Sequence, residues 1–276
     1  MKLKNINWKK VFRVSMYSLL AVSFMVLAGF VSKDKSNITC KGIRINIEDE
    51  EQRNFVDRAD IIQLLNSKSK KIKGSRMSEI NTAVLENIIN TNPYIKQAQV
   101  YSTIDGWVQI DVQQRIPVLR IINSVNESFY VDNTGNFMPL SDKFSEPVLV
   151  ANGFLFDTYV QQHVRDSSAY IKGDSIAKLN TIDQVYYLAS YINADTLYSS
   201  LIEQIYVNPF QEIELVPRLG NHIIILGDIT DLDEKMKKLE VFYRKGLNEA
   251  GWDQYETVNL KFKKQVVCTK RKLINS

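Results

Sequence analysis

Two histidines, His163 and His222, are the side chains best suited to move protons at neutral pH, and Cys268 could act as a nucleophile beside one of them. His222 lies in a strand-like pattern, which is more typical of a packed residue than of a catalyst. Cys268 follows two valines in an apolar strand, where a thiol is usually inert. His163 lies in a polar stretch without a neighbouring catalytic pattern. These residues therefore favour no particular reaction.

The spacings that mark catalytic and metal sites are also missing. The sequence contains no H-x-x-H or H-E-x-x-H pair, no G-x-S-x-G, no Walker loop and no G-x-G-x-x-G. Asp105, Asp132 and Asp228 lie near turn glycines, where aspartate is expected for turn geometry alone. Cys40 and Cys268 are too few for a disulfide framework or a multi-cysteine metal site, although one bridge between them stays open. We predict a protein that is not an enzyme and needs no metal or cofactor.

Basic residues gather at the two ends of the chain. Five lie within the first 13 residues, and six follow the last acidic residue, Glu256. The segment between them holds 24 basic and 31 acidic residues, a net charge of −7. A nucleic-acid-binding protein would instead spread a basic face over its folded domain. The charge pattern argues against nucleic acid as a partner.

Residues 14–31 contain 18 consecutive uncharged residues and predict a transmembrane helix. As a helix they span roughly 27 Å, close to the thickness of a bilayer core of about 30 Å. The excess of positive charge in residues 1–13 predicts that this tail is cytosolic, so the bulk of the chain is exported. A cleaved signal peptide is the alternative, but the apolar run is long for one and no A-x-A site follows it.

Residues 38–120 predict the element order β-α-α-β-β. Alternating isoleucines mark the first strand, a helix follows Asp57 or Asp60, and a second helix is predicted from Ser78 to about Asn90. Two strands then flank the hairpin turn Asp105-Gly106. One face of the first of these strands is expected to carry Ala98, Val100, Ser102 and Ile104.

This order, behind a predicted membrane anchor, resembles the POTRA module of the FtsQ/DivIB family of bacterial cell-division proteins. The resemblance extends over nearly the whole chain and implies an α+β fold, with a POTRA domain at 38–120 and a β-domain at 121–269. It is carried by Asn92-Pro93-Tyr94-Ile95, by Asp105-Gly106-Trp107-Val108-Gln109-Ile110-Asp111-Val112, by Gln113-Gln114-Arg115-Ile116-Pro117, and by Tyr130-Val131-Asp132-Asn133-Thr134-Gly135.

Residues 121–269 predict a mainly antiparallel β-domain with two helices. The first helix is expected at about 174–192, and the second begins at Asp231 or Asp233 and ends near Asn248. The domain is expected to end in one continuous strand, TVNLKFKKQVVCTK, and residues 270–276 form a basic tail.

The final strand is the predicted site of partner binding, because no later segment is expected to cover its outer side. In the FtsQ/DivIB family this region binds FtsB, and with it FtsL, by strand addition. The resemblance carries over at Val258-Asn259-Leu260-Lys261-Phe262. Six uncompensated positive charges nearby favour an acidic partner segment. The predicted partner-binding residues are Val258, Leu260, Lys261, Phe262, Lys263, Lys264 and Val266.

The resemblance thus implies a divisome scaffold that recruits FtsB-like and FtsL-like membrane-anchored proteins. Such a protein would sit in the cytoplasmic membrane at the division septum, with its N-terminus in the cytosol and its main part in the periplasm. One alternative is a membrane-anchored POTRA protein of envelope biogenesis. An anchored envelope hydrolase is a weaker alternative, because the chain lacks a recognisable nucleophile and base.

Overall fold

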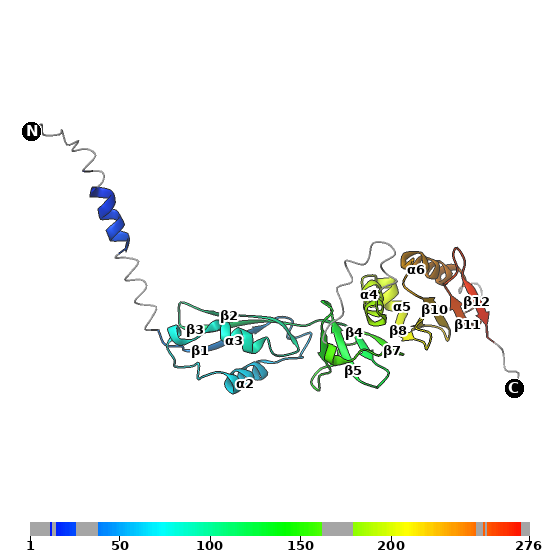
Figure 1. Cartoon of the computed structure of the whole chain (residues 1–276), viewed down its shortest axis with the longest axis horizontal. Coiled ribbons are helices and arrows are strands. Elements are labelled where there is room, and N and C mark those ends of the chain that lie inside the picture. Colours follow the sequence, from blue (N-terminus) through cyan, green and yellow to red (C-terminus); the bar gives the residue numbers. More distant parts are fainter. Residues whose placement is uncertain are drawn as a thin grey trace, which may run out of the picture. The chain divides into compact units, whose positions relative to one another are not determined.

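The computed structural model describes Phe12 and residues 15–25, 38–161, 179–246, 251 and 253–271. The chain divides into two compact units (Figure 1). The first contains the residues up to Gln52 together with Val56–Gln114, and the second contains Arg53–Phe55 and the chain from Arg115 onward. The first unit has a three-stranded sheet and the second a nine-stranded sheet.

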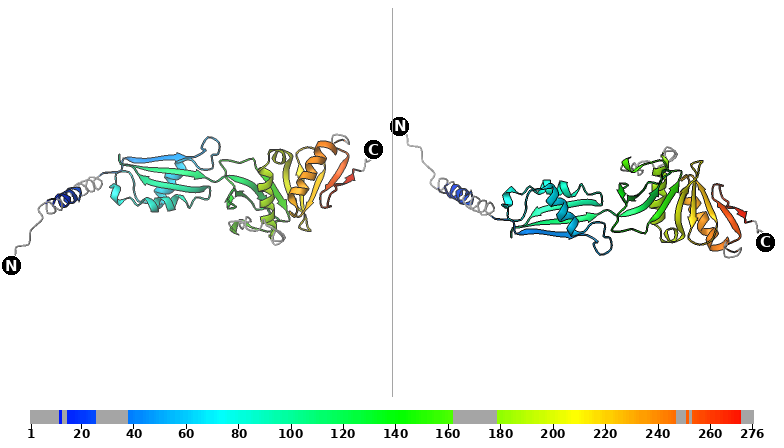
Figure 2. Two further views of the ribbon diagram at one scale, coloured as in Figure 1. Left: turned by 90° about the horizontal axis from the view of Figure 1, so that it is seen from above. Right: turned by 90° about the horizontal axis from the view of Figure 1, so that it is seen from below.

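The first unit has the predicted order β-α-α-β-β. Its sheet has the order β1-β3-β2, with β1 parallel and β2 antiparallel to the central strand β3. The two α-helices lie on one face of this sheet (Figure 2). The elements are β1 (Gly42–Ile47), α2 (Arg58–Lys68), the 3-10 helix η1 (Met77–Glu79), α3 (Thr82–Ile89), β2 (Ile95–Ser102) and β3 (Trp107–Gln114).

Two predicted boundaries in this unit differ from the structure. The single helix expected from Ser78 is divided, because the Asn81 side chain accepts a hydrogen bond from the Val84 amide and starts α3 anew. Strand β2 ends at Ser102, because the Thr103 amide donates to Trp107 O and closes the hairpin. Ile104 was expected on the strand face with Ala98, but it lies in the turn and is 86% exposed.

The second unit is built on one large sheet with the strand order β12-β11-β10-β9-β8-β7-β4-β5-β6. Five of its eight pairings are antiparallel and three, β4–β7, β7–β8 and β10–β11, are parallel. The prediction of an α+β fold with a mainly antiparallel β-domain is confirmed. The strands are β4 (Pro117–Ile122), β5 (Ser128–Asp132), β6 (Phe137–Pro139), β7 (Leu149–Gly153), β8 (Ile202–Val207), β9 (Ile213–Pro217), β10 (Ile223–Gly227), β11 (Tyr255–Asn259) and β12 (Val267–Lys270).

Helices cover one face of the large sheet (Figure 2) and complete its core. The described helices of this unit are the 3-10 helix η2 (Tyr159–Gln161), α4 (Thr181–Asn193), α5 (Thr196–Leu201), α6 (Leu232–Val241) and the π-helix η5 (Phe242–Gly246). The sequence analysis missed α5, which Asp195 caps by accepting from the amides of Leu197 and Tyr198. The first helix was expected at about 174–192 but begins only at Thr181, because Asn180 caps it by accepting a hydrogen bond from the Asp183 amide. The expected end of the second helix near Asn248 lies outside the described residues.

The buried carboxylate of Asp132 holds together the predicted Tyr130–Gly135 hairpin. Its Oδ1 accepts hydrogen bonds from the Thr134 amide and hydroxyl and from the Asn136 amide, at 2.7–2.8 Å. Its Oδ2 lies 2.6 Å from Nη1 of Arg115, a residue of the same unit. Asp132 is fully buried. The aspartate of this motif therefore fixes the turn between β5 and β6 and ties it to the start of the unit.

Residues 15–25, part of the predicted transmembrane segment 14–31, are helical and exposed. Within the described part of the chain, no helix is both long and apolar enough to cross a membrane. Residues 14 and 26–31 of the predicted segment lie outside that part. The transmembrane helix stays a prediction.

Candidate functional site

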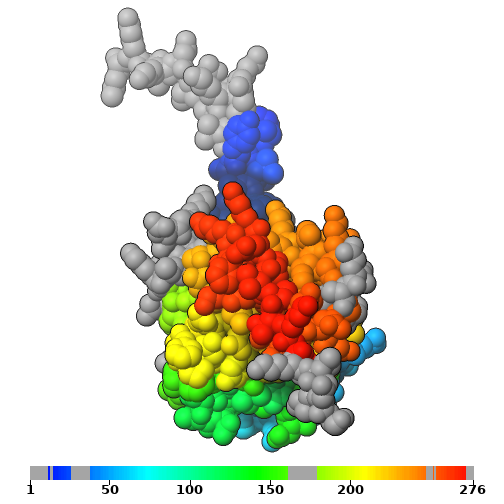
Figure 3. All heavy atoms as spheres, turned by 90° about the vertical axis from the view of Figure 1, so that its right-hand side faces the viewer, coloured from blue at the N-terminus to red at the C-terminus, as the bar shows by residue number. Residues whose placement is uncertain are grey.

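The C-terminal end of the large sheet is a hairpin. The expected continuous final strand ends at Asn259, and β12 folds back antiparallel onto β11, with Val258 opposite Cys268 and Asn259 opposite Val267. The flank of β11 that was expected to be free is therefore covered by the chain itself, and this prediction was wrong. The edge of the sheet is β12, whose atoms lie at the surface facing the viewer in Figure 3.

The backbone of β12 presents alternate groups to its free flank. The Leu260 amide donates to Ile225 O at 2.9 Å, which directs Leu260 toward β10. By the alternation of a strand, Asn259 then points toward β12 and pairs with Val267. The amide and carbonyl of Cys268, and those of Lys270, consequently point away from β11. No described strand pairs with this flank of β12.

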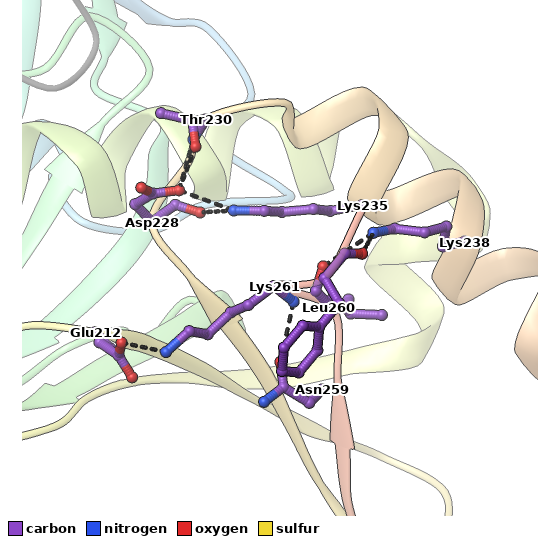
Figure 4. A network of polar contacts seen from close by, with 9 residues as sticks. Glu212, Asp228, Thr230, Lys235, Lys238, Asn259, Leu260 and Lys261 are labelled. Atoms are coloured by element: carbon purple, nitrogen blue, oxygen red, sulfur yellow. Dashed lines mark hydrogen bonds and ion pairs between the residues drawn. The ribbon is translucent and has the colours of Figure 1, made fainter. Parts of the chain in front are cut away.

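The loop between β11 and β12 is held by a lysine of α6. Lys238 Nζ donates to Leu260 O at 3.0 Å and to Phe262 O at 2.7 Å (Figure 4). These two carbonyls belong to the segment that was expected to continue the strand. The ammonium group thus satisfies backbone acceptors where β11 ends. Sequence analysis did not single out Lys238, although it lies one residue from the buried Leu239 on an amphipathic helix.

Two lysines near this end of the sheet form ion pairs with carboxylates. Lys261 Nζ forms an ion pair with Glu212, and Lys235 Nζ lies 2.8 Å from Asp228 Oδ1 (Figure 4). The Lys261 stem also lies across Gly227, where a Cβ would meet Lys261 Cγ at 2.9 Å. Gly227 has φ +78°, so both the backbone and this close approach require glycine. Of the six positive charges that were expected to be uncompensated, the charge of Lys261 is paired with Glu212.

The predicted partner-binding residues occupy three different environments. Val258 and Leu260 are fully buried in the unit's own core, so their side chains do not face a partner in this structure. Val266 is partly buried against the same core. The remaining four are exposed on the loop, with Phe262 at 46%. The exposed predicted residues are Lys261, Phe262, Lys263 and Lys264.

The described histidine and the two cysteines, which were the candidates for chemistry, are wholly or partly buried. His222 is buried and its Nε2 lies 2.6 Å from the hydroxyl of Tyr243. Burial raises the pKa of the Cys268 thiol, which keeps it protonated at neutral pH. Both Cys40 and Cys268 are free thiols. His163 lies outside the described residues, among which no group of three or more His, Cys, Asp or Glu could hold a metal.

Buried His222 should make the stability of the second unit depend on pH. Burial, followed by the charge of Arg271, lowers the pKa of His222 below 6.5. Below about pH 6.5 the unfolded chain then binds a proton that the folded chain does not, so the free energy of unfolding should fall as the pH drops. Urea unfolding at several pH values measures this decline, which should be weaker in His222→Gln. An equal decline in both proteins would contradict the prediction.

Replacing Lys238 by Met should loosen the C-terminal hairpin. The change removes two charge-assisted hydrogen bonds, which contribute roughly 1.5–3 kcal/mol each when made to a charged group. Amide hydrogen exchange in residues 260–270 should become at least tenfold faster. Lys237→Met is the matched control, because Lys237 is the exposed neighbour on the same helix. Equal exchange in the two variants would show that Lys238 does not hold the hairpin.

The structure is that of a two-domain α+β protein. A small domain with a three-stranded sheet comes first in the chain, and a domain with a large mixed sheet, whose C-terminal edge strand is β12, follows it. The family model described as FtsQ/DivIB, C-terminal related, matches residues 116–269, and a POTRA-like domain model matches residues 38–113. The first match alone covers more than half of the chain. The chain therefore belongs to the FtsQ/DivIB family, and the predicted resemblance is confirmed. A comparison with curated proteins finds no match.

Proposed function

We propose that this protein is a non-enzymatic scaffold of bacterial cell division that recruits FtsB-like and FtsL-like partners by strand addition at β12. Membership of the FtsQ/DivIB family supports a role in cell division, and its domains are typically non-catalytic. The observation that carries the mode of binding is the open flank of β12 at the end of the large sheet. A partner strand placed there would extend the sheet.

The chemistry of this edge fits a modest, reversible interaction. The outward amides and carbonyls of Cys268 and Lys270 offer four backbone hydrogen bonds, each contributing about 1 kcal/mol net. Val267 is 41% exposed and Phe262 is 46% exposed, so apolar contacts on β12 and its loop can add to these bonds. After the entropy cost of association, dissociation constants around the micromolar range are expected.

The proposed partner segment is acidic. Lys263 and Lys270 are exposed and no described residue forms an ion pair with them. Their charges would steer an acidic strand toward the edge and make association depend on salt. Lys261 contributes less, because it already pairs with Glu212.

The proposal places the protein in the cytoplasmic membrane at the division septum, anchored by residues 14–31, with its N-terminus in the cytosol and the folded units in the periplasm. The uncharged run of 18 residues and the positive charges before it support this topology. An anchor would confine the scaffold and its membrane-bound partners to one surface and raise their effective concentration.

Depletion of the protein tests the proposed role. Cells should grow into filaments that fail to divide, and the full chain should co-purify with membrane-anchored coiled-coil division proteins. Outer-membrane defects without filamentation would favour the alternative, a membrane-anchored POTRA protein of envelope biogenesis. A measurable hydrolase activity on envelope polymers would instead favour the weaker alternative, an anchored envelope hydrolase.

A further inference from the structure

The first unit has two chemically different ends. Because β1 and β3 are parallel and Gly42 lies opposite Trp107, both strands start at the same end, here called the proximal end. The turn between β2 and β3 also lies there, since the Lys41 amide donates to Gly106 O at 2.8 Å. At the opposite, distal end, Ile47, the last residue of β1, lies opposite Val112 of β3.

The loop after α2 is fastened to the proximal end. The Gly74 amide donates to Cys40 O at 2.8 Å, the Cys40 amide donates to Ser75 O at 2.8 Å, and Thr39 forms a β-bridge with Arg76. The loop therefore lies beside the segment that leads in from the N-terminal part of the chain (Figure 1).

Positive charge is concentrated at the proximal end. Five exposed basic residues at this end make no ion pair with any described carboxylate, whereas Arg44 of β1 forms a 3.7 Å ion pair with Asp105 of the β2–β3 turn. The distal end is acidic instead, because the residues that follow β1 are Glu48, Asp49, Glu50 and Glu51. The unit is thus electrically polarised along its strands. The exposed proximal basic residues are Lys41, Lys70, Lys71, Lys73 and Arg76.

An apolar side chain projects from the same end. Ile104 lies in the β2–β3 turn and is 86% exposed. The turn packs closely against residues 38 and 39, because a Cβ at Gly106 would meet Ile38 Cγ2 at 3.0 Å and Thr39 O at 3.1 Å. An exposed isoleucine at the same end of the unit as unpaired lysines is the combination that favours the interface of an anionic bilayer, where apolar groups enter the headgroup layer and cations face phosphates.

We propose that the proximal end of the first unit binds the surface of an anionic phospholipid bilayer, with Ile104 in the headgroup layer and Lys70, Lys71 and Lys73 on lipid phosphates. The inference rests on the proposed anchor, because residue 38 follows residue 31 by seven positions, a reach of at most about 25 Å. Contact would orient the unit with its acidic distal end away from the membrane.

The test uses the full chain in nanodiscs of pure phosphatidylcholine or of phosphatidylcholine mixed with phosphatidylglycerol. An environment-sensitive fluorophore is attached at Ile104→Cys in a Cys268→Ser background, since the remaining Cys40 is only 2% exposed. Its emission should shift to the blue in the anionic discs alone. The same probe at Gln52→Cys, an exposed position at the distal end, should report water in both.

Charge reversal separates lipid contact from nonspecific probe behaviour. Each basic residue near an anionic surface raises affinity about fivefold, so Lys70→Glu, Lys71→Glu and Lys73→Glu together should weaken contact by more than about 100-fold and abolish the shift. The matched control reverses three exposed lysines of the second unit, Lys237, Lys245 and Lys263, and should keep the shift. With the parent charges, 1 M salt should also abolish it, because the screening length falls to about 3 Å.

Each outcome has a distinct meaning. If the chain enters nanodiscs but the probe at 104 reports water in both lipid mixtures, lipid contact is refuted while the anchor stands. An equal shift in both mixtures would refute the role of the lysines and hence the proposed anionic surface. If the chain does not enter nanodiscs, the anchor fails and the proposed contact fails with it.

Discussion

Replacing Cys268 by proline is expected to weaken binding of an FtsB-like partner by on the order of 10- to 100-fold while the second unit stays folded. The Cys268 amide points to the free flank of β12, so the change removes a donor to the partner strand and no bond to β11. The partner carbonyl would be left without a donor, at a cost of about 1–3 kcal/mol. The proline ring would also obstruct the incoming backbone.

Two variants make this result interpretable. Cys268→Ala keeps the amide and should bind like the parent chain, which separates the amide from the thiol. Thr269→Pro removes an amide that faces β11, since Thr269 pairs with Thr257, and should lower stability as well as binding. The measurements are co-purification with the partner and thermal unfolding of each full-length variant. Unimpaired assembly of a folded Cys268→Pro chain would rule out strand addition at β12.

Replacing Asp132 by alanine is expected to destabilise the second unit by about 3–5 kcal/mol, a large share of the 5–15 kcal/mol typical of a folded domain. The change removes three hydrogen bonds to the β5–β6 turn and the ion pair with Arg115. Arg115 is only 20% exposed in its side chain and would lose its 2.6 Å carboxylate partner. Urea unfolding measures the loss.

The matched variants separate charge from turn geometry. Asp132→Asn keeps an acceptor oxygen for the turn and should lose less stability than Asp132→Ala. Asp142→Ala removes an exposed aspartate nearby in the chain and should change stability by less than about 0.5 kcal/mol. If Asp132→Ala were no more harmful than Asp142→Ala, the buried network would not support the fold.

Local patterns predicted most elements of the first unit. The alternation of apolar residues indicated β1 and β3, and Asp105-Gly106 indicated the hairpin. The start of α2 was predicted at Asp57 or Asp60, and the cap is Asp57. These features depend on residues close in sequence, so they are readable without tertiary contacts. The prediction was wrong at Ile104, because the alternation of apolar and polar residues does not show where a strand ends and its turn begins.

The C-terminal edge of the sheet was predictable in place but not in geometry. The sequence by itself determined the family and located a strand edge near the end of the chain. Only the tertiary structure decided that β12 covers β11, that Val258 and Leu260 are buried, and that Lys238 holds the loop between the strands. The physical reason is that strand pairing and lysine–carbonyl contacts join residues distant in sequence, whereas periodicity records only which positions are apolar.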